Sequence, residues 1–179
     1  MGSTPDEITP DTKDWTWVLE RPCPECGFDP AAQGLADLPD LIRGTAAEWA
    51  LALSRSDARE RPAVGVWSAL EYGCHVRDVH VLFGERLRLM LTEDEPTFAN
   101  WDQDATAVER DYAGQDPAVV SAELVRAAAD VAAVYSGVSG PAAHRPGVRS
   151  NGDRFTVASL GSYHLHDVVH HLHDVGARA

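Results

Sequence analysis

Five of the eight histidines in the chain fall within ten residues near its C-terminal end, at His164, His166, His170, His171 and His173. Apolar side chains recur between them at helical spacing, at Leu165, Val168, Val169, Leu172 and Val175. This stripe predicts an amphipathic helix that follows Thr156 as N-cap and ends near Val175. Two imidazoles four residues apart on one helix can reach a single metal ion. The segment therefore constrains both the fold and the chemistry of the chain.

Three further segments have helical spacing, over residues 35–54, 68–91 and 117–137. The second begins with Ser68 and Glu71 at the spacing of a capping box, and the third begins with Asp116 followed by a proline. Residues 92–115 are predicted to be a crossover with a short helical piece, and residues 137–155 either a long loop or a short hairpin. Because no βαβ alternation occurs, the chain is predicted to be all-α, a four-helix bundle with one long crossover.

Residues 1–33 are rich in Pro, Asp and Thr and are predicted to form an N-terminal arm held by Trp15 and Trp17, with residues 34–179 as the helical domain. Cys23 and Cys26 in this arm have the spacing of half a zinc site or of a redox pair. A loop with two reduced thiols is the third interpretation. An odd count of three cysteines without an export signal does not indicate a disulfide framework.

The acidic composition excludes several classes of partner. Fifteen Lys and Arg against 28 Asp and Glu give a formal net charge of −13. This sign disfavours binding to nucleic acid or to an anionic membrane surface. No apolar run approaches the ~20 residues of a membrane span, and the N-terminus does not resemble a secretory signal. We expect a cytoplasmic protein that acts on a small molecule or thiol, and a homodimer is compatible with this pattern.

The position of the histidine pair on its helix leaves two interpretations open. His166 and His170 lie on one side, away from the apolar stripe, so they face either water or a polar cleft. A third ligand from another helix would favour the cleft. His75 is the other histidine predicted to point inward, because it falls inside the apolar arc of the 68–91 helix and a buried polar group needs a partner.

Two stretches carry a family resemblance: Trp67-Ser-Ala-Leu-Glu-Tyr-Gly-Cys-His-Val-Arg-Asp78 and His166-Asp-Val-Val-His-His-Leu172. Together they resemble the DinB-like superfamily over roughly residues 35–175. That group includes the metal-binding domain of mycothiol-dependent maleylpyruvate isomerase and the bacillithiol transferases. The resemblance implies a four-helix bundle that holds one divalent metal through His75, His166 and His170. The isomerase has a Glu at the first position of the last-helix pair, where this sequence has His166, as in the three-His members.

This ligand set would leave a coordination position open, as in catalytic zinc sites. Zinc is the expected metal, and nickel, iron and manganese are alternatives. Such an ion activates water or a bound thiol, so the resemblance implies a metal-dependent thiol S-transferase or a related hydrolase. The alternative is a non-catalytic metal- or small-molecule-binding stress-response protein. No further catalytic residue is assigned.

Several other side chains are candidates for the surroundings of the metal. Asp102, Asp167 and Asp174 are each expected either to orient an imidazole or to form solvated ion pairs. Trp101 either lines the cavity or belongs to the core, and Arg86 either holds an anionic substrate group or forms a buried ion pair. His164, His171 and His173 are expected to lie outside the ligand set.

Overall fold

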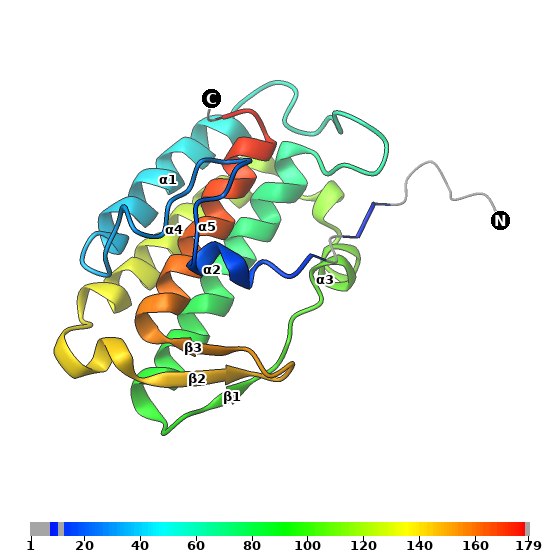
Figure 1. The fold of residues 1–179 in the computed structure, drawn as a ribbon. Coiled ribbons are helices and arrows are strands. Elements are labelled where there is room, and N and C mark those ends of the chain that lie inside the picture. Colours follow the sequence, from blue (N-terminus) through cyan, green and yellow to red (C-terminus); the bar gives the residue numbers. More distant parts are fainter. Residues whose placement is uncertain (1–7, 11–12, 178–179) are drawn as a thin grey trace.

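A computed structural model describes residues 8–10 and 13–177, so parts of the predicted arm lie outside the described residues. Four long helices form the body of the molecule (Figure 1): α1 Leu38–Leu53, α2 Ala69–Thr92, α4 Pro117–Ser136 and α5 Val157–Asp174. Their bounds agree with the four predicted helices to within three residues. The predicted all-α four-helix bundle is therefore confirmed.

A small sheet closes one end of the bundle, formed by β1 Thr97–Phe98, β2 Pro146–Arg149 and β3 Arg154–Thr156. β1 pairs with β2 in parallel and β2 pairs with β3 antiparallel. The segment after α4 is thus a hairpin, whose turn contains Gly152 at a φ of +99°. β1 was not predicted, because two residues are too short to show the alternation of a strand.

Shorter helices occupy the remaining connections: η1 Thr16–Leu19 in the arm, α3 Gln103–Glu109 and η2 Tyr112–Gly114 in the crossover, and η3 Gly140–His144 before the hairpin. None of the helices in the described part of the chain combines the length and apolar character needed to cross a membrane.

Both α2 and α5 begin at capping boxes. The Ser68 hydroxyl accepts a hydrogen bond from the Glu71 amide, and the Glu71 carboxylate accepts one from the Ser68 amide at 2.8 Å. Thr156 and Ser159 make the equivalent pair at the start of α5. These bonds satisfy amides that a helix start leaves without partners. They fix where each helix begins, and hence which side chains face the neighbouring elements.

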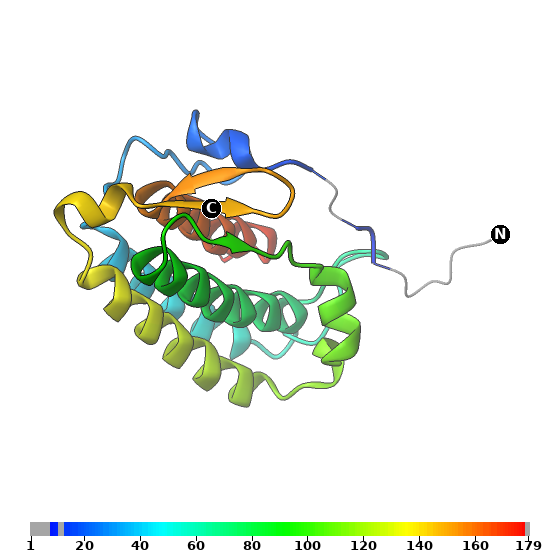
Figure 2. The same ribbon diagram turned by 90° about the horizontal axis from the view of Figure 1, so that it is seen from below.

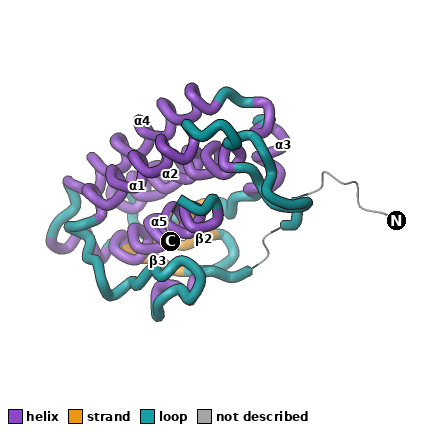
Figure 3. Tube along the Cα trace, turned by 90° about the horizontal axis from the view of Figure 1, so that it is seen from above, coloured by secondary structure: helices purple, strands orange, loops and turns teal. Residues whose placement is uncertain are grey.

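The four helices bury a common core against which α5 presents its apolar stripe. The largest fully buried side chains include Trp49, Leu70, Leu124 and Leu172, one from each of the four helices. α4 lies on the opposite side of the bundle from the N-terminal arm (Figures 2 and 3). The arm instead crosses α5, and its Cys23 and Phe28 join the same core. α5 is therefore flanked by α2 on one side and by the arm on the other.

Candidate metal centre

Two groups of metal-binding side chains meet on α5. In each group, one ligand atom from every member lies within 4.8 Å of the others. One group combines a residue of α2 with two of α5: His75, Asp167 and His171. The other combines two residues of the arm with two of α5: Cys23, Cys26, His166 and His170. The two α5 pairs have the same i, i+4 spacing and are shifted by one residue along the helix.

The distances within the first group suit a shared cation. His75 Nε2 lies 3.4 Å from Asp167 Oδ1, and His171 Nε2 lies 3.8 Å from the same oxygen. Two nitrogen or oxygen ligands bound to one tetrahedral zinc lie about 3.4 Å apart, since each is about 2.0–2.1 Å from the ion. The three side chains are thus already close to the separation that a common ion requires.

Buried polar atoms of this group lack hydrogen-bond partners among the described residues. They are both ring nitrogens of His75 and Oδ1 of Asp167, and His75 is 1% exposed. A buried polar group without a partner costs about 1–3 kcal/mol, so a native structure normally supplies one. A divalent metal between His75, Asp167 and His171 would satisfy Asp167 Oδ1 and one ring nitrogen of His75, since each side chain offers one ligand atom. The residues present therefore fit the metal that the family resemblance implies.

The charge states of this group also suit a cation. Burial lowers the pKa of His75, so its imidazole is neutral at pH 7. Burial raises the pKa of Asp167, but the facing His75 and His171 imidazoles outweigh it and hold that pKa below the ordinary range. Neutral imidazole and ionised carboxylate are the protonation states in which these side chains bind metals.

Surrounding side chains hold the two imidazoles in place. His171 Nδ1 donates a hydrogen bond to Asp174 Oδ2 at 2.8 Å, which leaves Nε2 for a metal. The Trp101 ring stacks on His75 with centroids 5.2 Å apart and planes at 14°. Trp67 packs against His75 from another side at 5.6 Å. Packing fixes the His75 imidazole and a hydrogen bond fixes that of His171, so both are positioned in the absence of a metal.

Two members of this group, Asp167 and His171, lie in the wall of a pocket of about 970 Å³. Aromatic side chains from the arm and the crossover contribute to its lining, together with several carboxylates and the two cations Lys13 and Arg149. The volume is at the upper end of the range for small-molecule sites, about 300–1,000 Å³. The first group thus has access to a cavity that can hold a substrate.

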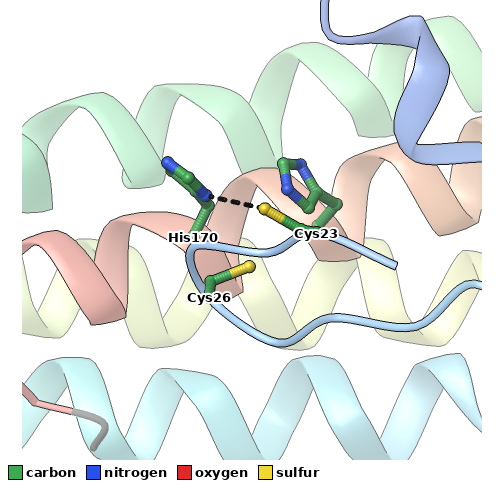
Figure 4. A group of neighbouring side chains, drawn as sticks. Cys23, Cys26 and His170 are labelled. Carbon is green, nitrogen blue, oxygen red and sulfur yellow. Dashed lines mark hydrogen bonds between the residues drawn. The ribbon is translucent and has the colours of Figure 1, made fainter. Parts of the chain in front are cut away.

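The second group is built on a turn of the arm, and its His166 and His170 line the same pocket. Cys23 Sγ lies 3.7 Å from His170 Nδ1 (Figure 4). The Cys26 sulfur faces the same space from the same loop. Burial raises the pKa of the Cys26 thiol to about 11. Reactive redox cysteines have lowered pKa values instead, so the redox interpretation of this pair loses support.

The structure does not bring together the ligand set that the resemblance implied. His75 meets Asp167 and His171, whereas His166 and His170 meet the two cysteines of the arm. His171, which was expected to lie outside the ligand set, is a member of the first group. Successive residues of a helix point about 100° apart. The pairs His166/His170 and Asp167/His171 therefore lie on opposite sides of the apolar stripe and face different neighbours. Because both pairs have the same i, i+4 spacing, the spacing alone does not predict which pair faces His75.

The other predicted residues have distinct positions. Trp101 and Asp102 line the pocket, and Asp102 is also the N-cap of α3, where it accepts a hydrogen bond from the Ala105 amide. Asp174 orients His171 as described. Arg86 is not among the pocket residues: it donates to the Ala99 carbonyl and lies over the Phe83 and Phe98 rings. Neither an anionic substrate group nor a buried ion pair explains this arginine.

A fourth histidine of α5 forms a separate buried pair. His164 Nε2 lies 3.0 Å from His80 Nδ1 of α2 inside the bundle. Burial lowers the pKa of His164 to about 4 and that of His80 well below its ordinary value. His164 is a member of neither candidate ligand group and is a buried core residue, whereas His173 is exposed.

Comparisons with known proteins agree with this architecture. A solved structure with a similar fold is YfiT from Bacillus subtilis, described as a probable metal-dependent hydrolase with an unusual four-helix bundle topology. The two share 20% sequence identity with a TM-score of 0.71, over 80% of this chain and 85% of YfiT. A comparison with curated proteins found no match. The family model of the DinB superfamily matches residues 40–175, which include all four bundle helices except the first two residues of α1. The chain belongs to the DinB superfamily.

Proposed function

We propose that this protein is a metal-dependent enzyme whose His75, Asp167 and His171 bind one catalytic divalent ion. The reaction that we propose is transfer of a low-molecular-weight thiol to a small electrophile. The observation that carries the proposal is the meeting of three ligand atoms within 4.8 Å, two of them from Asp167 and His171 in the wall of a large pocket. Two of these ligands have buried atoms without hydrogen-bond partners among the described residues.

The composition of the ligand set supports catalysis over a structural role. Two imidazoles and one carboxylate form a set found in catalytic zinc sites, which leave the fourth position for water or substrate. Zinc is the proposed metal, and nickel, iron and manganese also accept these ligands. When bound, the ion supplies a lowered pKa for a coordinated thiol or water. A carboxylate at the first position of the α5 pair is also what the resemblance describes for the thiol-dependent isomerase.

The protein's own residues position and shield the site. Asp174 holds His171 in one orientation, and Trp67 and Trp101 cover His75. Tyr72 packs against the His171 ring at 4.9 Å. These aromatic surfaces limit the access of water and leave the pocket side of the ligands for substrate. Several carboxylates around the pocket favour a neutral or cationic electrophile over an anionic one.

A thiol-transfer assay tests the proposal directly. The untagged protein, loaded in turn with zinc, nickel, iron or manganese, is incubated with a panel of small thiols and electrophiles. We expect conjugation above the rate of the metal-free protein with at least one metal. We expect His171→Ala to reduce this rate by at least about 100-fold, because it removes a ligand. His173→Ala, an exposed histidine two residues away, is the matched control.

The outcomes separate the candidate functions. A metal-dependent rate that needs water but no thiol would replace the proposed transferase with a hydrolase. If metal-loaded and metal-free protein gave equal rates with every combination of thiol and electrophile, the enzymatic proposal would be overturned. The non-catalytic binding protein would then be favoured. An unchanged rate in His171→Ala would overturn the ligand assignment.

A further inference from the structure

The arm residues Cys23 and Cys26 and the α5 residues His166 and His170 meet outside the catalytic group. We propose that these four side chains form a second metal site, a structural zinc centre that fastens the N-terminal arm to α5. The site does not depend on the proposed catalytic function, because it shares no ligand with the first group.

The types and sequence spacing of these four side chains are those of a structural zinc site, in which protein ligands fill every coordination position. Two cysteines three positions apart and two histidines four positions apart supply two sulfurs and two nitrogens, the Cys₂His₂ set of structural zinc. Cys23 Sγ and His170 Nδ1 are 3.7 Å apart. A sulfur at about 2.3 Å and a nitrogen at about 2.0–2.1 Å from a tetrahedral ion lie about 3.6 Å apart. The side chains thus already have nearly the separation that zinc would impose.

The arm is folded so that both sulfurs face α5. The Cys23 amide donates to the Phe28 carbonyl at 2.8 Å, and the Gly27 amide donates to the Cys23 carbonyl at 2.9 Å. Gly27 has a φ of +73°, a conformation that favours glycine and that turns the chain directly after Cys26. This tight turn holds two cysteines of the arm beside two histidines that lie 140 or more residues later in the sequence.

Burial supports a bound ion and disfavours a solvated cluster. Cys23 is 1% exposed, His166 is 3% exposed and His170 is 6% exposed. Nε2 of His166 is buried and has no hydrogen-bond partner among the described residues. Two thiolates would balance the charge of a divalent ion, so the complete site would be neutral. A neutral tetrahedral centre can be buried at this depth, whereas an isolated charge would be costly.

Neighbouring side chains hold both imidazoles. Trp15 packs edge-on against His170 at 4.7 Å, and Phe28 packs against His166 at 5.4 Å. The Glu25 carboxylate, between the two cysteines, lies 3.5 Å from His170 Nε2. A carboxylate at the far nitrogen orients a histidine ligand and strengthens its bond to a metal. Four protein ligands leave no open position, which assigns this centre to structure and not to catalysis.

The centre would also shape the pocket. The arm contributes Lys13, Asp14, Trp15 and Glu25 to the pocket wall. In the described part of the arm, η1 is the single helix and no strand occurs. A zinc ion between the arm and α5 would fix these residues relative to the catalytic group. Loss of that ion is therefore expected to loosen one wall of the pocket while the four-helix bundle remains.

Cobalt substitution tests the proposal, because a thiolate bound to Co²⁺ gives intense near-ultraviolet absorption that nitrogen and oxygen ligands do not give. We expect this absorption in the untagged wild-type chain, and its loss in Cys26→Ser and in His166→Ala. Cys74→Ser removes a buried cysteine outside the site and should keep it. Metal analysis of the zinc form should give two ions in the wild type and one in Cys26→Ser.

The wild-type spectrum is decisive even where a variant fails to fold. Absence of the thiolate absorption in wild-type protein with cobalt bound would overturn the proposal, as would a Cys23–Cys26 disulfide in protein purified under reducing conditions. His171→Ala distinguishes this site from the catalytic one, because it should lose one zinc and keep the cobalt–thiolate absorption. An absorption lost in His171→Ala but kept in His166→Ala would contradict the ligand assignment.

Discussion

His170 and His171 are adjacent on α5, and their side chains belong to different ligand groups. Their ring centroids are 5.9 Å apart with planes at 78°. Nδ1 of His170 faces the Cys23 sulfur, whereas Nδ1 of His171 is bonded to Asp174 and its ring meets His75 edge-on at 4.8 Å. One helix thus carries two overlapping i, i+4 pairs, each completed by a different element of the chain.

Asp174→Ala should weaken metal binding at the catalytic group without removing a ligand. The substitution deletes the carboxylate that orients His171, and loss of such a partner typically costs 10–100-fold in metal affinity. Competition with a chelator of known affinity measures the change. Asp40→Ala, an exposed carboxylate paired with Arg43 on α1, is the control and should leave the affinity unchanged. Equal affinity in the Asp174 variant and the wild type would show that this hydrogen bond does not tune the metal.

Chelation of zinc should expose the arm to proteolysis. Glu20 and Glu25 lie in the arm on either side of Cys23, and Glu25 precedes the ligand Cys26. A glutamate-specific protease should cut at these positions faster in chelator than in zinc, because the arm would be held to α5 by zinc. Mass spectrometry identifies the cleavage sites. His171→Ala should keep the zinc-dependent protection, and equal cleavage rates with and without chelator would contradict the role of the second centre.

Gly161→Ala should destabilise the bundle where α5 packs against α1 and α4. An added Cβ would lie 2.3 Å from Leu38 Cδ1 and 3.1 Å from Tyr135 Cε1. Overpacking of this kind costs about 1–3 kcal/mol, which denaturant titration would measure. Gly44→Ala is the matched control in α1, because its Cβ would meet nothing within 4 Å and should stabilise the helix by about 0.5–1 kcal/mol. A Gly161 variant as stable as the wild type would show that α5 can shift away from α1 and α4.

The buried pair His80–His164 should make folding sensitive to mild acid. The pKa of His164 is about 4 in the folded protein, and that of His80 is also well below its ordinary value. An unfolded histidine has a pKa of about 6.5, so the unfolded chain binds more protons between about pH 4 and 6.5. Stability should therefore be full above pH 6.5 and fall as the pH drops, by about 1.4 kcal/mol per pH unit for each histidine.

His80→Asn isolates this effect, because asparagine can keep the hydrogen bond to His164 and does not titrate. Unfolding free energies of both proteins would be measured at several values between pH 4.5 and 7. Metal loss in acid is common to both, so the difference between the two slopes reports His80 alone. We expect the slope of the variant to be smaller, and identical slopes would show that folding does not lower the pKa of His80.

The sequence was sufficient for the bundle and insufficient for the division of ligands. Capping residues at Ser68 and Thr156 and the apolar periodicity predicted the helices, because both signals are local. The pairing of α5 residues with partners is not local: it depends on how α5 is rotated about its axis and on where the arm crosses it. Cys23 and Cys26 already suggested half of a zinc site, and His166 and His170 have the spacing of the other half. The family resemblance places His166 and His170 in one metal site with His75. The sequence alone therefore does not pair these histidines with Cys23 and Cys26.

Anomalous diffraction at the zinc absorption edge, from crystals of the untagged zinc-loaded protein, tests the two-site account most directly. The account predicts two anomalous peaks in each chain. One should lie between Cys23, Cys26, His166 and His170, and the other between His75, Asp167 and His171. A single peak bound by His75, His166 and His170 would contradict it.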